Sequence, residues 1–261
     1  MNFESVRKTF ILNGKSMDQR FFDTIQLALS PERLSVYGQD RPGPCVVLAR
    51  YLWNAALCES LYTPLQMCEV ALRNSIHNTM RSLYNDTWYD QVTLKNLGHT
   101  KIIEAKMKIT RTGKPVIPSR IIAELQFGFW TGMFEGPFEQ NTPSLLKGIR
   151  DIFPQLSNRL RNPKFIKSRL DTIRHLRNRV FHHERIVHWK DLPEQHGRLI
   201  ETIGWISPEL CEMALKLDRF LETYTHGVGP WIASVRNHWP VKPLIQSTDT
   251  ASTDPTTANT P

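Results

Sequence analysis

The sequence predicts an all-α protein, and two observations lead to this class. Apolar residues recur three and four positions apart over most of the chain, which is the spacing of one face of an α-helix. No stretch shows the alternation of a half-buried strand, a hairpin signal, or strands alternating with helices. Proline and glycine then divide the chain into segments of helical length.

Caps and prolines place the expected helices of the first half. Ser16 and Gln19 have the spacing of a capping box, and Ser30 precedes Pro31, which suits a first helical position. Pro64 is expected in the first turn of a further helix, because proline lacks the backbone donor that a helix interior needs. The expected elements in this half are residues 16–29, a short helix from 31, 46–61, 64–83 and a basic helix over 94–110.

The second half continues in the same way. An apolar and aromatic segment over 120–134 contains Phe127, Phe129, Trp130 and Phe134, which can form core or stack on nucleobases, and core is the favoured interpretation. The further expected helices are residues 145–160 with a break at Pro154, 164–188 and 209–224.

We expect one helical domain over residues 1–240 and a disordered tail over 241–261. From Gln246 onward, eight of the sixteen residues are Ser or Thr and none is a large apolar residue. Such a segment cannot contribute to a core.

Composition and local patterns exclude several classes of protein. The chain is 40% hydrophobic and 22% charged, which excludes fibrous and wholly disordered proteins. The longest apolar run near the N-terminus covers only 46–49, and the first residues lack the pattern of a secretory signal. The four cysteines form no CxxC pair. We therefore expect a reduced, cytoplasmic protein with no membrane contact.

The positive charge is concentrated in one window. The chain carries 33 Lys and Arg against 25 Asp and Glu, a net charge of +8. Residues 147–179 hold ten of the basic residues and only two acidic ones, so the rest of the sequence is balanced. This pattern predicts a polyanionic partner such as RNA, although a solvated basic surface is the alternative. The residues expected to contact RNA are Lys164, Lys167, Arg169, Arg174 and Arg179.

The helix expected over 164–188 contains candidate catalytic groups. At about 100° per residue, Arg177 and Glu184 fall on its apolar face, which is costly for an arginine unless it is paired or functional. Asn178 and His182 project together from another side. In one interpretation Arg177 pairs with Glu184 and the histidines are solvated. In the other, these side chains act on RNA.

Arginine, asparagine and histidine together suit cleavage of RNA through the ribose 2'-hydroxyl. The reaction needs a base for the hydroxyl proton, an acid for the leaving oxygen and a cation for the phosphate. Histidine titrates near neutrality and can take either proton role, and arginine binds phosphate while staying charged. Asparagine can hold a histidine tautomer or a phosphate oxygen. None of these roles needs a metal ion or another cofactor, and we expect neither.

The spacing of Arg177, Asn178 and His182 resembles the signature of the HEPN superfamily. The wider string RNRVFHHE over 177–184 looks like the Abi-like (abortive infection, Abi_2-type) branch. Other segments of that branch follow in the expected order, namely YLWN over 51–54, EVALRN over 69–74 and FGFWTGMF over 127–134.

The resemblance implies a HEPN-like helical bundle with additional helices. It also implies a metal-independent endoribonuclease that acts in phage defence by abortive infection or as a toxin. In these roles His182 is the general acid or base, Arg177 binds the scissile phosphate and Asn178 orients it. Such motifs commonly meet across a dimer interface, so we expect a homodimer, with an antitoxin or a defence-system protein as a further partner.

Several residues are expected to support the motif. Glu69, Arg73 and His77 are spaced four apart, and the first two can hold the motif helix, although a surface ion-pair row is the alternative. His183 and Glu184 are given the same supporting role. A zinc site is not expected, because the HExxxH string from His183 turns its second histidine about 140° away from the first.

Two other functions fit the same residues. A non-catalytic RNA-binding protein would use the basic window alone and would show salt-dependent affinity without cleavage. A helical scaffold would use it to bind an acidic protein.

Overall fold

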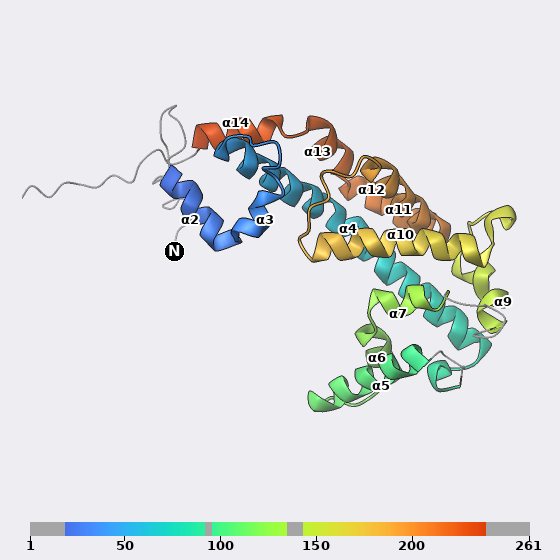
Figure 1. Ribbon diagram of the computed structural model, residues 1–261. Coiled ribbons are helices and arrows are strands. Elements are labelled where there is room, and N and C mark those ends of the chain that lie inside the picture. The colour runs from blue at the N-terminus through green and yellow to red at the C-terminus, as the bar shows by residue number, and fades with distance from the viewer. Residues whose placement is uncertain (1–18, 92–95, 135–142, 239–261) are drawn as a thin grey trace, which may run out of the picture. The chain divides into compact units, whose positions relative to one another are not determined.

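Helices form the regular structure throughout the described part of the chain, and no strand occurs there (Figure 1). The computed structural model describes residues 19–91, 96–134 and 143–238. The predicted all-α class is confirmed. Ser16 and the predicted tail over 241–261 lie outside the described residues. Among the described helices, none combines the length and the apolar content that crossing a membrane requires.

Residue contacts divide the chain into two compact units, which are described separately. Of the described residues, one unit comprises 19–49 and 230–238, and the other comprises those between 50 and 229. The candidate catalytic, supporting and RNA-binding residues all belong to the second unit.

The first unit contains three short helices among the described residues, and the cap of the second one agrees with the sequence signal. α2 (Gln19–Leu29) contacts α3 (Pro31–Ser35). Ser30 caps α3 as predicted, because its hydroxyl accepts a hydrogen bond from the backbone N–H of Arg33 at 3.2 Å. α14 (Gly229–His238) supplies the later part of this unit.

α4 is a single helix over Pro44–Leu83, and most of it belongs to the second unit. The prediction of two helices separated before Pro64 is wrong, since Pro64 lies inside a helix of 40 residues. An internal proline costs about 3 kcal/mol. A continuous buried row runs past it on both sides, and each large side chain contributes about 1.5–3 kcal/mol. The row consists of Leu57, Leu61, Leu65, Cys68, Leu72, Ile76 and Met80.

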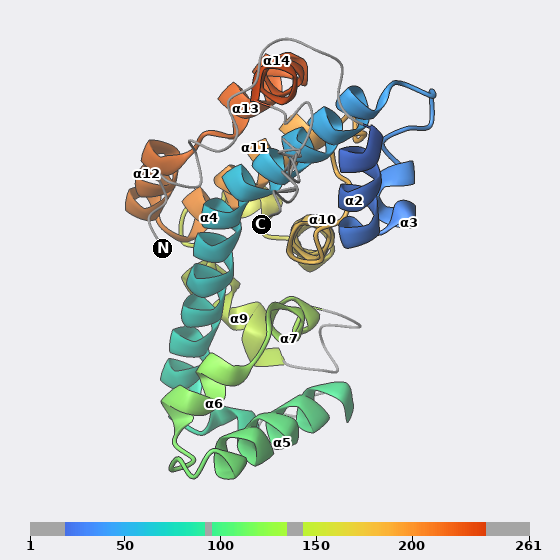
Figure 2. The same cartoon turned by 90° about the vertical axis from the view of Figure 1, so that its left-hand side faces the viewer.

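The helices that follow lie near the C-terminal end of α4. A 3-10 turn, η1 (Trp88–Asp90), leads to α5 (Asn96–Arg111) and α6 (Pro118–Glu124). α5 and α6 contact each other and lie side by side (Figures 1 and 2). α5 confirms the basic helix predicted over 94–110 to within two residues at its start and one at its end.

The aromatic segment over 120–134 divides into two helices, α6 and α7 (Phe127–Gly132), rather than one. Leu125 and Gln126 between them have extended backbone, and the carbonyl of Leu125 accepts a hydrogen bond from Trp130 Nε1 at 3.3 Å. The core interpretation of the aromatic residues is confirmed, because Phe127, Phe129, Trp130 and Phe134 are all buried.

The remaining elements of this unit are α9 (Pro143–Ile152), η2 (Asn158–Leu160), α10 (Pro163–Phe181), α11 (Leu192–Ile206), α12 (Pro208–Leu217) and α13 (Phe220–His226). The predicted break at Pro154 is confirmed. The prediction of one helix over 209–224 is wrong, because the chain is extended at Asp218, whose Oδ1 accepts from the N–H of Phe220 at 2.9 Å. α11 has no counterpart among the predicted helices.

Candidate functional site

α10 carries the motif at its C-terminal end and is anchored to the core along its length. Asn162 Oδ1 accepts hydrogen bonds from the N–H groups of Lys164 and Phe165, and Pro163 occupies the first helical position. The helix contacts α7 and α11. Its buried residues are Ile166, Leu170, Ile173, Leu176 and Val180. This packing fixes where the far end of α10 lies.

α10 ends at Phe181, so the prediction of a helix over 164–188 is wrong. His182 is the capping residue, and its N–H still donates to the carbonyl of Asn178 at 2.9 Å. His182 and His183 are both exposed. The candidate catalytic histidine therefore lies on a turn, directly beyond the end of the helix that carries Arg177.

The end of α10 is a Schellman motif. The N–H of His183 donates to the carbonyl of Val180 at 3.1 Å, and the N–H of Glu184 donates to the carbonyl of Arg179 at 2.9 Å. This pattern needs a left-handed residue between helix and turn, and His183 takes that conformation at φ 56°. Glycine usually occupies this position because side chains disfavour it.

His183→Gly is expected to leave the stability of the protein unchanged or to raise it by up to about 1 kcal/mol, because glycine adopts positive φ without strain. His183→Val is expected to lower it by more than 1 kcal/mol, since a β-branched side chain is an outlier there. Urea denaturation of the two variants tests this. A more stable valine variant would contradict the proposed role of the left-handed turn.

Asn54 on α4 holds the turn that follows α10. Its Nδ2 donates to the carbonyl of Glu184 at 3.2 Å, and its Oδ1 accepts from the N–H groups of Ile186 at 2.7 Å and Val187 at 3.1 Å. The side chain is only 4% exposed. Sequence reasoning gave this residue no role of its own, because nothing in the local pattern connects it to a turn 130 residues later.

Two histidines near the motif pack on one tryptophan. The ring of His175 stacks on Trp189 with centroids 5.4 Å apart and planes 10° apart, and His188 meets the same ring edge-on at 6.2 Å. Burial lowers the pKa of His188, and the positive charges of Arg185 and Arg179 lower it further. His175 therefore ties the turn to α10, and His188 favours its neutral form.

Arg177 is held by an acid and an aromatic ring. Its Nε lies 3.2 Å from Glu69 Oε2 on α4, and its guanidinium carbon lies 4.5 Å from the centroid of Phe181. One terminal nitrogen donates to Asn178 Oδ1 at 3.5 Å. Both side chains of the ion pair are about one quarter exposed. The pair is thus partly shielded, and the cation remains within reach of solvent.

The interpretation that Arg177 pairs with Glu184 is wrong, because Glu184 forms its ion pair with Arg179. Glu69 contacts the motif arginine directly, which is the contact that a supporting role requires. Arg73 instead donates to the side-chain oxygen of the next residue in α4, at 3.3 Å. The structure therefore brings Glu69, and not Arg73, to the motif.

Glu69→Gln is expected to lower the free energy of unfolding by about 1 kcal/mol, because it removes one charge of a partly shielded pair. It is also expected to reduce RNA cleavage, since Arg177 loses the anchor that orients it. Glu104→Gln on α5 is the matched control, because Glu104 is 54% exposed in its pair with Lys101. Equal effects of the two substitutions would contradict the anchoring role.

Arg169 is used within the fold. Its terminal nitrogen lies 2.6 Å from Glu201 Oε2, and its guanidinium carbon lies 4.5 Å from the ring centroid of Trp205. The side chain is only 12% exposed. Its contacts join α10 to α11 and leave little of it accessible to a polyanion.

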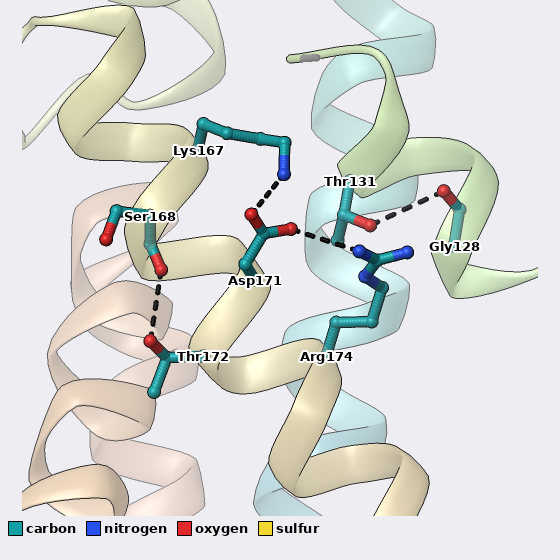
Figure 3. A network of polar contacts seen from close by, with 7 residues as sticks. All are labelled: Gly128, Thr131, Lys167, Ser168, Asp171, Thr172 and Arg174. Atoms are coloured by element: carbon teal, nitrogen blue, oxygen red, sulfur yellow. Dashed lines mark hydrogen bonds and ion pairs between the residues drawn. The ribbon is translucent and has the colours of Figure 1, made fainter.

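Lys167 and Arg174 share one carboxylate. Figure 3 shows Asp171 between them, with an ion pair to Lys167 and a 3.2 Å contact to a terminal nitrogen of Arg174. This network lies where α10 faces α7. Lys164, in the first turn of α10, is exposed. The predicted RNA-binding residues are thus spread along the helix and do not form one cluster.

Acids from outside the basic window reduce its effective charge. Arg177, Arg179 and Arg169 each pair with a glutamate that lies outside residues 147–179, namely Glu69, Glu184 and Glu201. The sequence count of +8 overstates the positive potential at the motif, because charge cancels locally. The basic window is therefore a weaker indication of an RNA partner than the motif itself.

A cleft of about 470 Å³ opens beside the end of α10, within the second unit. Tyr51 and Tyr62 of α4 line it together with Phe181 and His183, and Arg219 contributes a further basic group. Sequence reasoning did not find this cleft, because its walls come from segments more than 100 residues apart.

Within the described ranges, no three His, Cys, Asp or Glu side chains are grouped as metal ligands would be. When the chain is compared with models of protein families, with curated proteins and with solved structures, none of them matches it.

Proposed function

We propose that this chain is a metal-independent endoribonuclease whose active site is the end of α10. The observation that carries the proposal is the grouping of three side chains at this end. Asn178 begins the last helical turn, Arg177 directly precedes it, and His182 caps α10 and is exposed. A phosphate-binding guanidinium, an orienting amide and a titratable imidazole thus lie within six residues of one another in the sequence.

The reaction would proceed through the ribose 2'-hydroxyl. A base removes the hydroxyl proton, the 2'-oxygen attacks the adjacent phosphorus, and the bond to the 5'-oxygen breaks as an acid protonates that oxygen. The products are a 2',3'-cyclic phosphate and a 5'-hydroxyl. His182 would take one proton role, since an imidazole can serve as base or acid near neutral pH.

Arg177 would bind the scissile phosphate while Glu69 holds it. The ion pair uses Nε and the contact to Asn178 uses one terminal nitrogen, so donors of the guanidinium remain for an anion among the described contacts. Arginine offers five N–H donors in a planar fork, which suits a phosphate in the transition state. The stacking on Phe181 would keep this fork oriented.

A second copy of the chain would supply the other proton-transfer group. One motif offers His182 with Arg177, whereas the reaction needs a base and an acid together. In a two-fold dimer each motif would face its symmetry mate. The resemblance of residues 177–184 to the Abi-like branch supports a role in phage defence or as a toxin, with an antitoxin or defence-system protein as partner.

The test is cleavage of RNA by the purified chain in the presence of EDTA. We expect cleavage that EDTA does not abolish and that depends on His182 and Arg177. A wild-type chain that leaves RNA intact would contradict the proposal.

Non-catalytic RNA binding is the second candidate. The observation that favours it is that Lys164 at the start of α10 and Asn178 and His182 at its end are exposed, since exposed polar and basic side chains can bind RNA without cutting it. This alternative predicts RNA affinity that falls with salt and no product under any condition.

A further inference from the structure

The cleft beside α10 has the lining of a base-binding site. We propose that it binds one unpaired nucleobase of an RNA strand whose adjacent phosphate lies at Arg177. This inference rests on the proposed function and adds a substrate subsite to it. Its lining includes three aromatic rings, those of Tyr51, Tyr62 and Phe181.

Tyr62 gives the cleft an accessible aromatic ring. The residue is 49% exposed, so about half of it can be contacted by a ligand. Its ring stacks on Phe181 with centroids 5.1 Å apart and planes 24° apart. The pair forms a preorganised platform, and one further flat ring can extend the stack. Base–aromatic stacking of this kind contributes about 1–3 kcal/mol per base.

The walls of the cleft are mostly apolar. Ala55 and Val180 give apolar surface, and burial raises the pKa of the Cys58 thiol to about 11, which keeps it neutral. Asn54 also lines the cleft, but its amide already bonds the backbone of the turn. The carboxylate and the guanidinium of the lining, Glu59 and Arg219, pair with each other at 3.0 Å, so their charges balance. Such walls suit a flat uncharged base better than a phosphate. The volume of about 470 Å³ lies within the range of ligand sites and accommodates a nucleoside.

Phe181 links the cleft to the motif. Phe181 stacks with Tyr62, and it also lies against the guanidinium of Arg177. One ring therefore separates the cleft from the proposed phosphate-binding group. A nucleotide likewise carries its base and its phosphate on neighbouring sides of one sugar. Sequence-tolerant recognition of single-stranded RNA commonly combines stacking on aromatic rings with contacts from basic side chains. Arg219 also lines the cleft, where one terminal nitrogen donates to Glu59 at 3.0 Å, and the guanidinium has further N–H donors that suit the base edge or the sugar.

The experiment measures binding of the full chain to RNA that cannot be cut. The probe is a fluorescein-labelled octauridylate with 2'-O-methyl riboses, followed by fluorescence anisotropy. A second probe has the same backbone without bases. We expect wild type to prefer the first probe, and Tyr62→Ala to bind it about 5- to 100-fold more weakly while binding the abasic probe as wild type does. Tyr62→Trp should retain binding. Tyr84→Ala, the same change at the residue directly after α4, should have no effect.

Four results would overturn the proposal. The first is equal binding of the octauridylate by wild type and Tyr62→Ala, and the second is equal binding of both probes by wild type. The third is no binding of either probe by wild type. The fourth is full displacement of the probe by uridine monophosphate at concentrations near the probe affinity, which would indicate a free nucleotide as ligand. Cleavage of 2'-hydroxyl RNA is assayed separately. Base-dependent binding without cleavage would remove the catalytic proposal alone, and cleavage with normal binding by Tyr62→Ala would remove the cleft alone.

Discussion

His182→Ala is expected to lower the rate of RNA cleavage by about 10²- to 10⁴-fold, the contribution typical of general acid–base catalysis. The substitution removes only an exposed side chain, because the hydrogen bond from residue 182 to the carbonyl of Asn178 comes from the backbone. The turn and the end of α10 should therefore be retained. Single-turnover cleavage of a labelled RNA in EDTA, with circular dichroism of each variant, measures both effects.

His99→Ala is the matched control for this prediction, because His99 is also exposed and lies on α5. It should cut at the wild-type rate. Arg177→Ala should lose activity to a similar degree, since removal of one charged transition-state donor typically costs about 10²- to 10³-fold. Wild-type activity of His182→Ala would exclude this residue from catalysis, and loss of activity in His183→Ala alone would transfer the role to its neighbour.

Asn54→Ala is expected to lower the free energy of unfolding by about 2–5 kcal/mol. The substitution leaves the N–H groups of Ile186 and Val187 and the carbonyl of Glu184 without their partner. Each buried polar group without a partner costs about 1–3 kcal/mol, and Asn54 itself is buried. Urea denaturation measures the change.

Asn78→Ala is the control for the loss of an asparagine from α4, because Asn78 lies on the same helix and is exposed. This substitution should change the free energy of unfolding by less than about 0.5 kcal/mol. The variant Asn54→Ala should also cleave RNA poorly under conditions where it is folded, since the turn after His182 is no longer held. A change within 1 kcal/mol for Asn54→Ala would show that the turn is stabilised by other contacts.

The sequence could predict the helical class because the 3-4 spacing is a local signal, and α4, α5 and α10 all follow it. It could not predict that α4 continues through Pro64. That outcome depends on a buried row on both sides, whose packing against other helices outweighs the local cost of proline.

The end of α10 also escaped prediction, for a physical reason. Helices commonly end at a left-handed glycine, but here a histidine takes that conformation, so no breaker marks the boundary. The hydrogen bonds of Asn54 over 130 residues stabilise the turn instead. The helical wheel through residue 188 consequently misplaced Glu184, which pairs with Arg179 across the turn.

The candidate site was predictable in part. The spacing of residues along two helices singled out the motif and gave Glu69 a supporting role. The ion pair between Glu69 and Arg177 agrees with that expectation. The cleft and the local neutralisation of the basic window depend on which segments meet in space. Local pattern carries no such information, as Glu201 beside Arg169 illustrates.

End-group analysis of the cleaved RNA tests the central claim most directly. RNA is incubated with the wild-type chain in EDTA, and the new termini are identified by their response to phosphatase and kinase and by mass. Attack by the 2'-hydroxyl predicts a 2',3'-cyclic phosphate and a 5'-hydroxyl, both formed about 10²- to 10⁴-fold more slowly with His182→Ala. A 5'-phosphate with a 3'-hydroxyl would contradict the proposed chemistry, because it requires a water nucleophile that the proposed roles of Arg177 and His182 do not include.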